Sequence, residues 1–212
     1  MMNNPANKVI LIGYSGHSLV VSEVLLLSGF QIIGYLDKEM SITNLLNLNY
    51  LGFEKDNSVL QKIKGTHVFP AIGDNQIREA VTNYMEMNGF NFVSAIHPDS
   101  NISKLAFIGQ GTLVARGANI NPFAAIGKGV IINTGAIIEH ECQLDNFSHI
   151  APGAVLAGNV KIGKGSFVGA NAVVKQGVEI GNNVKIGAGA VVLNNVPSNA
   201  IMVGNPAKRM IK

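Results

Sequence analysis

The chain has 212 residues, of which 47% are hydrophobic and 14% are charged. This balance excludes intrinsic disorder and supplies enough apolar surface for a hydrophobic core. Sixteen Lys and Arg residues against thirteen Asp and Glu residues give a net charge of +3, without the dense basic run typical of nucleic-acid binding. The single cysteine, Cys142, excludes an internal disulfide framework and favours a reducing compartment.

No apolar stretch reaches the roughly 20 residues that a membrane span needs. Residues 1–5 also lack the basic and apolar regions of a secretory signal. We therefore expect a cytoplasmic protein.

The first 95 residues alternate short apolar segments with helical ones. The expected strands are residues 8–13, 30–36 and 66–72, and the expected helices are residues 19–27 and 76–88. This alternation predicts an α/β unit of the Rossmann-like βαβαβ type, built on a parallel sheet. We expect this unit to occupy residues 1–97 and a second domain of a different kind to occupy residues 98–212.

Polar residues follow the ends of all three expected strands, in the turn from Gly13 to His17, at Asp37 and from Gly73 to Asn75. Ligands of parallel sheets bind beyond the carboxyl ends of the strands, so these segments should meet in space. The turn lacks the G-x-G-x-x-G spacing of a dinucleotide site, although N–H groups at a helix start still bind phosphate. The pattern therefore fits either an ordinary βα turn or a ligand site at which His17 is exposed.

From residue 102 onward an aliphatic residue recurs at every sixth position. The sixteen positions are Ile102, Ile108, Val114, Ile120, Ile126, Ile132, Ile138, Leu144, Ile150, Leu156, Ile162, Val168, Val174, Ile180, Ile186 and Val192. The residue four places later is nearly always small or β-branched. A period of six fits neither an α-helix nor an alternating strand, but it is typical of a parallel β-helix in which each hexad supplies one strand and one turn.

This repeat resembles the hexapeptide-repeat family, whose left-handed parallel β-helix forms a triangular prism with three hexads in each coil. Sixteen hexads then form a little over five coils. Phe123, Phe147 and Phe167 have no obvious place inside such a prism, and we expect them to serve an interface between prisms.

One stretch departs from the Gly-, Ala- and Lys-rich pattern of the repeat: residues 133–142, which include His140, Glu141 and Cys142, followed by His149. His140 occupies a turn position and should be accessible to solvent. A histidine beside a carboxylate suits a general base near neutral pH. Cys142 occupies an inward position and is not expected to act as a nucleophile.

Several segments together resemble one subgroup of the family, the nucleotide-sugar acetyltransferases and related sialic-acid O-acetyltransferases. The segments are Gly13-Tyr14-Ser15-Gly16-His17, His97-Pro98, the stretch from Asn133 to Cys142, and Phe147-Ser148-His149. The resemblance covers residues 8–209. It is greatest to acetyl-CoA-dependent enzymes that acylate the 4-amino group of UDP-linked amino sugars, as in bacillosamine synthesis.

The resemblance implies a role for each site residue. His140 would be the general base and Glu141 would strengthen it. Acetyl-CoA, a co-substrate, would contact His149, Gly158, Ala170 and Ala188, with the Gly158 N–H donating to the thioester oxygen. The nucleotide sugar would contact Tyr14, Ser15, Gly16, His17, Asp37, Lys38, Gly73 and Asn75. The family also implies a homotrimer with the acetyl-CoA cleft between neighbouring prisms, and a product used for surface glycans or glycoproteins.

Two departures leave the nucleotide and the sugar open. Tyr14 stands where relatives often carry a small residue, and Lys38 follows Asp37 where the bacillosamine-type enzyme has a second acid. An O-acetyltransferase acting on sialic acid or a related sugar is one alternative function. A non-catalytic sugar-binding scaffold is another, although a scaffold has no use for a base. A prism-shaped carbonic anhydrase needs three histidine ligands and the repeat offers two, so no metal is expected.

Overall fold

The computed structural model describes residues 7–210 of the chain. Residues 1–6, on which the expectation about a secretory signal depends, lie outside the described part. Within residues 7–210, no helix is both long enough and apolar enough to span a bilayer.

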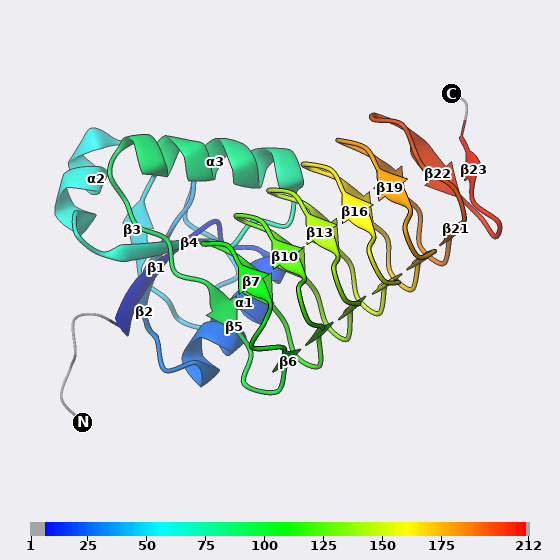
Figure 1. The fold of residues 1–212 in the computed structure, drawn as a ribbon. Helices are drawn as coiled ribbons and strands as arrows, with labels where there is room; N and C mark the ends of the chain where they lie inside the picture. Colours follow the sequence, from blue (N-terminus) through cyan, green and yellow to red (C-terminus); the bar gives the residue numbers. More distant parts are fainter. Residues whose placement is uncertain (1–6, 211–212) are drawn as a thin grey trace.

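The N-terminal unit is a four-stranded parallel sheet covered by helices on both faces (Figure 1). The strands lie in the order β3 (Tyr50–Gly52), β2 (Gln31–Leu36), β1 (Lys8–Ile12), β4 (His67–Pro70). The helices are α1 (Gly16–Leu27), α2 (Asn57–Ile63) and α3 (Asn75–Met87). Successive residues of β1 point to opposite faces, so Leu11 packs with α1 and Ile10 packs with α2 and α3.

Residues 95–209 form a parallel β-helix with three faces, as the six-residue period predicts (Figure 1). We name the faces by what lies on them. The covered face comprises β5 (Ala95–Ile96), β8 (Leu113–Val114), β11 (Ile131–Ile132), β14 (His149–Ile150), β17 (Phe167–Val168), β20 (Lys185–Ile186), β22 (Ile201–Val203) and the antiparallel β23 (Lys208–Arg209). The aliphatic face comprises β6 (Asn101–Ile102), β9 (Asn119–Ile120), β12 (Ile137–Ile138), β15 (Val155–Leu156), β18 (Val173–Val174) and β21 (Val191–Val192). The grooved face comprises β7 (Phe107–Ile108), β10 (Ala125–Ile126), β13 (Gln143–Leu144), β16 (Lys161–Ile162) and β19 (Glu179–Ile180).

The recurring aliphatic residues fill the interior of the prism, and the small residues four places later pack between them. Equivalent positions in successive coils are 18 residues apart, as in the pairing of Ile137 with Val155 and of Val155 with Val173. The sequence prediction of an α/β unit followed by a hexapeptide β-helix is therefore confirmed.

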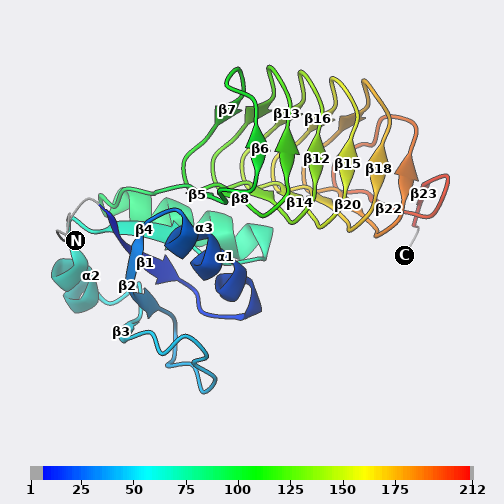
Figure 2. The same ribbon diagram turned by 90° about the horizontal axis from the view of Figure 1, so that it is seen from below.

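The N-terminal unit packs against the covered face and against the turns that enter it from the grooved face (Figure 2). Outward-pointing Ala95, Leu113 and Ile131 of this face share a core with Val21 and Leu25 of α1. In the described part of the chain the other two faces carry no second layer. The outer surface of the aliphatic face is formed by Ile137, Val155, Val173 and Val191, with Asn101 and Asn119 at its N-terminal end.

Candidate active site

His140 and Glu141 lie in the turn between β12 and β13, at the corner where the aliphatic and grooved faces meet. We call this corner the His140 corner. The His140 side chain is 51% exposed, and its Nδ1 lies 3.0 Å from Oε2 of Glu141. An ionised carboxylate can only accept a hydrogen bond, so Nδ1 donates, and in a neutral ring Nε2 then carries the lone pair. This is the tautomer that a general base needs.

Gly158, one coil further along the same corner, supports the imidazole ring. A Cβ atom at Gly158 would lie 2.5 Å from both Cε1 and Nε2 of His140, so only glycine leaves room for the ring in this position. Among residues 7–210 no group accepts a hydrogen bond from the Gly158 N–H. A free N–H directly beside the base is geometrically suited to donate to a developing oxyanion.

Replacing Gly158 with alanine is expected to lower kcat by about 100-fold, because a misplacement of about 1 Å in a reacting group has that effect. The backbone itself tolerates side chains here, since Pro122, His140 and Gln176 occupy the equivalent position in other coils. Gln176→Ala is therefore the matched control and should leave kcat unchanged. In a His140→Ala background, Gly158→Ala should cause no further loss, and an additive loss would show that Gly158 acts independently of the ring.

The polar segments at the carboxyl ends of β1, β2 and β4 do come together. The Tyr14 N–H donates to Oδ2 of Asp37 over 2.9 Å, and a Cβ at Gly73 would lie 3.7 Å from Cβ of His17. We call residues 13–17, 37–38 and 73–75 the cradle. A hollow of about 510 Å³ opens beside Asp37 and Lys38, and a second of about 270 Å³ opens beside Ser15 and Gly16.

Two cradle side chains differ from the sequence expectation. The Tyr14 side chain is buried and stacks on Tyr35 with 4.4 Å between ring centroids. Tyr14 therefore contributes its backbone, and not its ring, to the surface of the cradle. His17 was expected to be exposed, which is wrong: its Nε2 is buried, because α1 lies against the covered face.

His17 and His149 approach each other across the junction between the two units, with ring centroids 6.4 Å apart. Burial, with the charge of Arg78 as the second cause, lowers the pKa of His17 to about 4 and that of His149 to about 3. Both rings are therefore neutral at pH 7. His149 Nε2 lies 3.3 Å from Nδ2 of Asn133, and the His149 and Phe167 rings form an edge-to-face pair with 5.0 Å between ring centroids.

Arg78 joins the two units and was not identified from the sequence. Its side chain is 1% exposed, and among residues 7–210 no carboxylate lies within hydrogen-bond distance of it. Instead the guanidinium donates to backbone carbonyls on both sides of the junction and to one amide side chain: Ile72, Gly73, Gly129, Phe147 and the side chain of Asn75. Burial lowers the pKa of Arg78 to about 10, so the group stays charged at neutral pH.

Asn75, expected from the sequence to contact the sugar, is also part of this junction. Its Nδ2 donates to the carbonyl oxygen of Gly165 over 2.9 Å, while its Oδ1 accepts from Arg78. Asn75 therefore fixes the position of the Gly73 segment against the β-helix.

The candidate site residues fall on opposite sides of the prism. The cradle and His149 lie at the covered face, whereas His140, Glu141 and Gly158 lie at the one corner that does not border this face. Ala170 and Ala188 lie on a third position, the corner between the covered and aliphatic faces, which we call the Ala188 corner. The aliphatic face separates the two corners.

Cys142 is fully buried, and its Sγ lies 3.2 Å from the carbonyl oxygen of Ala157. Burial raises the pKa of the thiol to about 11, so the thiolate is scarce at neutral pH and Cys142 is unsuited to nucleophilic catalysis. In the described residues no three His, Cys, Asp or Glu side chains gather as metal ligands.

Comparison with known proteins identifies two family models in the chain. Residues 8–85 match the PglD N-terminal domain, and residues 159–194 match the bacterial transferase hexapeptide of six repeats. Among curated proteins, the UDP-N-acetylbacillosamine N-acetyltransferase of Bacillus subtilis (strain 168) is 32% identical over 108 residues. That match covers 50% of this chain and 50% of the relative, so the chain is matched over only about half of the relative's length.

Solved structures match over nearly the whole chain, and two of them illustrate the likeness. One is a histidine-to-asparagine variant of perosamine N-acetyltransferase from Caulobacter crescentus in complex with CoA and GDP-perosamine, with 35% identity, a TM-score of 0.91 and coverage of 97% of each chain. The other is the acetyltransferase domain of PglB from Neisseria gonorrhoeae FA1090, with 34% identity, a TM-score of 0.89 and coverage of 96% of this chain and 100% of that one.

An α/β unit joined to a hexapeptide β-helix, with a histidine–carboxylate pair on one corner, defines an acyltransferase of the hexapeptide-repeat class. The chain belongs to the family of nucleotide-sugar acetyltransferases that contains the perosamine and bacillosamine N-acetyltransferases.

Proposed function

We propose that the protein transfers the acetyl group of acetyl-CoA to the amino group of a nucleotide-linked 4-amino-deoxy sugar, a building block for surface glycans or glycoproteins. The observation that carries this proposal is the His140–Glu141 pair resting on Gly158, because it places a base beside a free N–H donor. The histidine-substituted relative was solved with CoA and GDP-perosamine together, which supports a reaction between a thioester and an amino sugar.

The reaction needs no covalent enzyme intermediate. The sugar amine attacks the thioester carbonyl carbon while Nε2 of His140 takes a proton from the amine. The Gly158 N–H donates to the oxyanion that forms. The C–S bond then breaks, and the imidazolium returns its proton to the departing CoA sulfur. Glu141 accepts from Nδ1 throughout and stabilises the positive charge on the ring.

The nucleotide sugar is held by the cradle in this proposal. Ser15 directly precedes α1 and Gly16 begins it, and the backbone N–H groups and the helix dipole at this end favour phosphate. Asp37 and Lys38 border the larger hollow and meet the base and ribose. His17, neutral at pH 7, and the Gly73 segment lie at the side nearest the β-helix and contact the sugar.

One chain alone cannot bring the cradle to its own His140, because the prism lies between them. We infer a homotrimer in which the aliphatic faces surround the threefold axis. Ile137, Val155, Val173 and Val191 form a β-branched stripe that association would bury. The His140 corner of one copy then meets the Ala188 corner and the cradle of the next.

Acetyl-CoA occupies the cleft between the two corners in this arrangement. Gly158 contributes from one copy, and Ala170 and Ala188 contribute from the other. His149 belongs to the second group, because its Nε2 points to Asn133 at the Ala188 corner. In this proposal residues 1–97 bind the acceptor sugar, and residues 98–212 bind acetyl-CoA and supply the general base. A reaction that consumes acetyl-CoA also favours a cytoplasmic location.

The direct test is to incubate the protein with acetyl-CoA and UDP-, GDP- and dTDP-linked 4-amino sugars, with free sialic acid beside them, and to follow release of the CoA thiol. Thiol release with an amino sugar, together with an acetamido product by mass spectrometry, is the expected result. Turnover only with sialic acid would replace the proposal with O-acetylation. Binding of the sugars without turnover would indicate a scaffold.

A further inference from the structure

Arg78 is the fourth residue of α3, and its side chain contacts two segments of the proposed site at once. On the cradle side, Nη1 donates to the carbonyl oxygens of Ile72 and Gly73 over 3.1 Å each. On the β-helix side, Nε donates to the carbonyl oxygen of Gly129 over 2.7 Å and Nη2 donates to that of Phe147 over 2.9 Å. One rigid guanidinium therefore spans the gap between the cradle and the β-helix.

The contacts on the β-helix side belong to the turn that leads into His149. Phe147 and Ser148 directly precede β14, which begins at His149. The φ of Phe147 is +58°, in the left-handed region that an aromatic residue seldom adopts, and such a conformation persists where its surroundings hold it. The ring of Phe147 is buried over Gly129, so of the three phenylalanines expected at an interface between prisms this one packs inside the chain. The position of His149 thus follows a turn whose carbonyl oxygen binds Arg78.

On the cradle side, Arg78 holds the segment that borders His17. A Cβ at Gly73 would lie 3.7 Å from Cβ of His17, and the Gly73 carbonyl oxygen accepts from Arg78. Asn75 Oδ1 also accepts from Nη2 of Arg78, over 2.8 Å. Gly73 and His149, which are proposed to contact the sugar and acetyl-CoA, are therefore tied to the same guanidinium.

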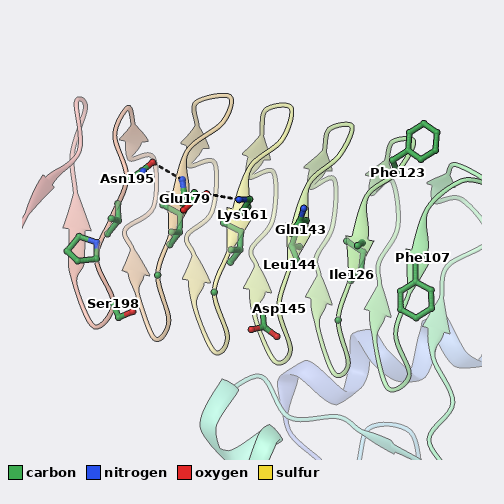
Figure 3. A pocket seen from close by; sticks show the side chains of 18 residues that line it. Phe107, Phe123, Ile126, Gln143, Leu144, Asp145, Lys161, Glu179, Asn195 and Ser198 are labelled. Atoms are coloured by element: carbon green, nitrogen blue, oxygen red, sulfur yellow. Dashed lines mark hydrogen bonds and ion pairs between the residues drawn. The ribbon is translucent and has the colours of Figure 1, made fainter.

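The turns that bind Arg78 lie at the corner between the grooved and covered faces. Their other side borders a groove of about 930 Å³ along the grooved face, with Asp145 at this corner and Phe107 and Phe123 at the N-terminal end (Figure 3). Within residues 7–210 no element covers the turns from the grooved face, so their support comes from neighbouring coils and from α3.

A buried charge is an unfavourable means of simply attaching two units, because the charged group must leave water. The guanidinium group offers something that an apolar contact does not, a planar fork of five donors that fits one arrangement of acceptors. The side chain of Arg78 therefore specifies how the two units are oriented, in addition to attaching them.

We propose that Arg78 is a positioning residue for acetyl transfer. It fixes the cradle relative to His149, so that the amino group of a bound nucleotide sugar meets the thioester carbonyl carbon of acetyl-CoA. This inference rests on the proposed function and adds a residue that contacts neither substrate. A displacement of about 1 Å in a reacting group can lower the rate about 100-fold, so a loosened junction should impair transfer more than it impairs binding of acetyl-CoA.

The test is Arg78→Lys, which keeps the positive charge but replaces the planar fork with a compact ammonium group. The value of kcat/KM for the amino sugar should fall by about 10- to 100-fold, while the Kd of acetyl-CoA stays within about twofold. Both are measured at a temperature at which circular dichroism shows the variant fully folded. Glu86→Gln is the matched control: Glu86 joins α3 to Lys128 through a partly exposed ion pair, and its loss should change kcat/KM by less than about twofold.

Arg78→Ala provides a second readout, because it leaves a space that a free guanidinium ion can occupy. Guanidinium at millimolar, non-denaturing concentration should raise the kcat/KM of this variant by about tenfold or more, because the ion restores the planar donors. Ammonium at the same concentration should not. Neither ion should change the activity of Glu86→Gln.

An unchanged kcat/KM in folded Arg78→Lys would overturn the proposal, and so would an equal loss of acetyl-CoA affinity. Equal rescue of Arg78→Ala by ammonium, or no rescue by guanidinium in the folded variant, would also contradict a role for the planar fork. If Arg78→Ala does not fold, Arg78→Lys decides alone. Failure of the proposed function is distinguishable, because the wild-type protein itself would then acetylate none of the amino sugars.

Discussion

Replacing His140 with alanine is expected to lower turnover by about 10²–10⁴-fold, the usual effect of losing a general base. The ring is held by Glu141 on one side and by the Gly158 backbone on the other, and no second basic side chain shares the turn from Glu139 to Cys142. Single-turnover kinetics with saturating amino sugar would measure the effect on the chemical step.

Binding of acetyl-CoA should change little in the same variant. Of the residues proposed to contact acetyl-CoA, only Gly158 lies beside His140. A dissociation constant from calorimetry, compared with the wild type, checks this. Near-normal turnover would remove His140 from the mechanism, and an equal loss of turnover and of acetyl-CoA affinity would make it a binding residue.

Replacing Arg78 with methionine is expected to lower the free energy of unfolding by about 3–5 kcal/mol, because several buried hydrogen bonds from one charged group are lost together. Methionine retains the apolar stem but leaves the carbonyl oxygens of Gly129 and Phe147 without their donor. Denaturant unfolding followed by circular dichroism measures this change.

Arg78→Lys is the informative companion, because lysine keeps the charge but cannot reproduce the planar set of donors. The free energy of unfolding of Arg78→Lys should lie between those of the wild type and Arg78→Met. Replacement of Arg116, whose ion-pair partners Glu23 and Asp99 are exposed and whose contact with the buried His97 Nε2 is long at 3.3 Å, should change the free energy of unfolding by less than about 1 kcal/mol. If replacing Arg78 lowers the free energy of unfolding no more than replacing Arg116 does, the Arg78 guanidinium does not hold the two units together.

The repeat could be predicted in detail from the sequence because each hexad repeats the same local requirement. In every coil the aliphatic residue must face the same narrow interior, so the pattern recurs with each hexad. The N-terminal unit was predicted less completely. Strand β3 and helix α2 were missed because Tyr50–Gly52 has only three residues and Asn57–Ile63 only seven, too few for a hydrophobic period to emerge.

The junction was not predictable in the same way. An arginine in an amphipathic helix normally faces solvent, and the burial of Arg78 depends on carbonyls 51 and 69 residues away. One signal was present: Arg78 shares a helical face with Thr82 and Met85, which are both buried. The burial of His17 likewise depends on the packing of α1 against the β-helix, and this packing cannot be predicted from the local sequence.

The separation of the cradle from His140 also emerged only from the structure. The order of residues along the chain shows which segments carry the cradle and His140, but it does not predict on which faces of the prism they lie. Their opposite placement makes a shared site between copies the central claim, in which His140 of one chain acts on a sugar held by another.

Mixing two inactive variants tests this claim most directly. His140→Ala lacks the base. Gly16→Arg fills the cradle, at a position where a side chain meets nothing within 4 Å and the fold is retained. Each variant alone should be inactive, and the activity of co-refolded mixtures would be followed by CoA thiol release. Random assembly of equal amounts restores each shared site with a probability of about one quarter, so about a quarter of wild-type activity should return. No recovery in mixed trimers would contradict the shared site, and activity of Gly16→Arg alone would contradict the cradle.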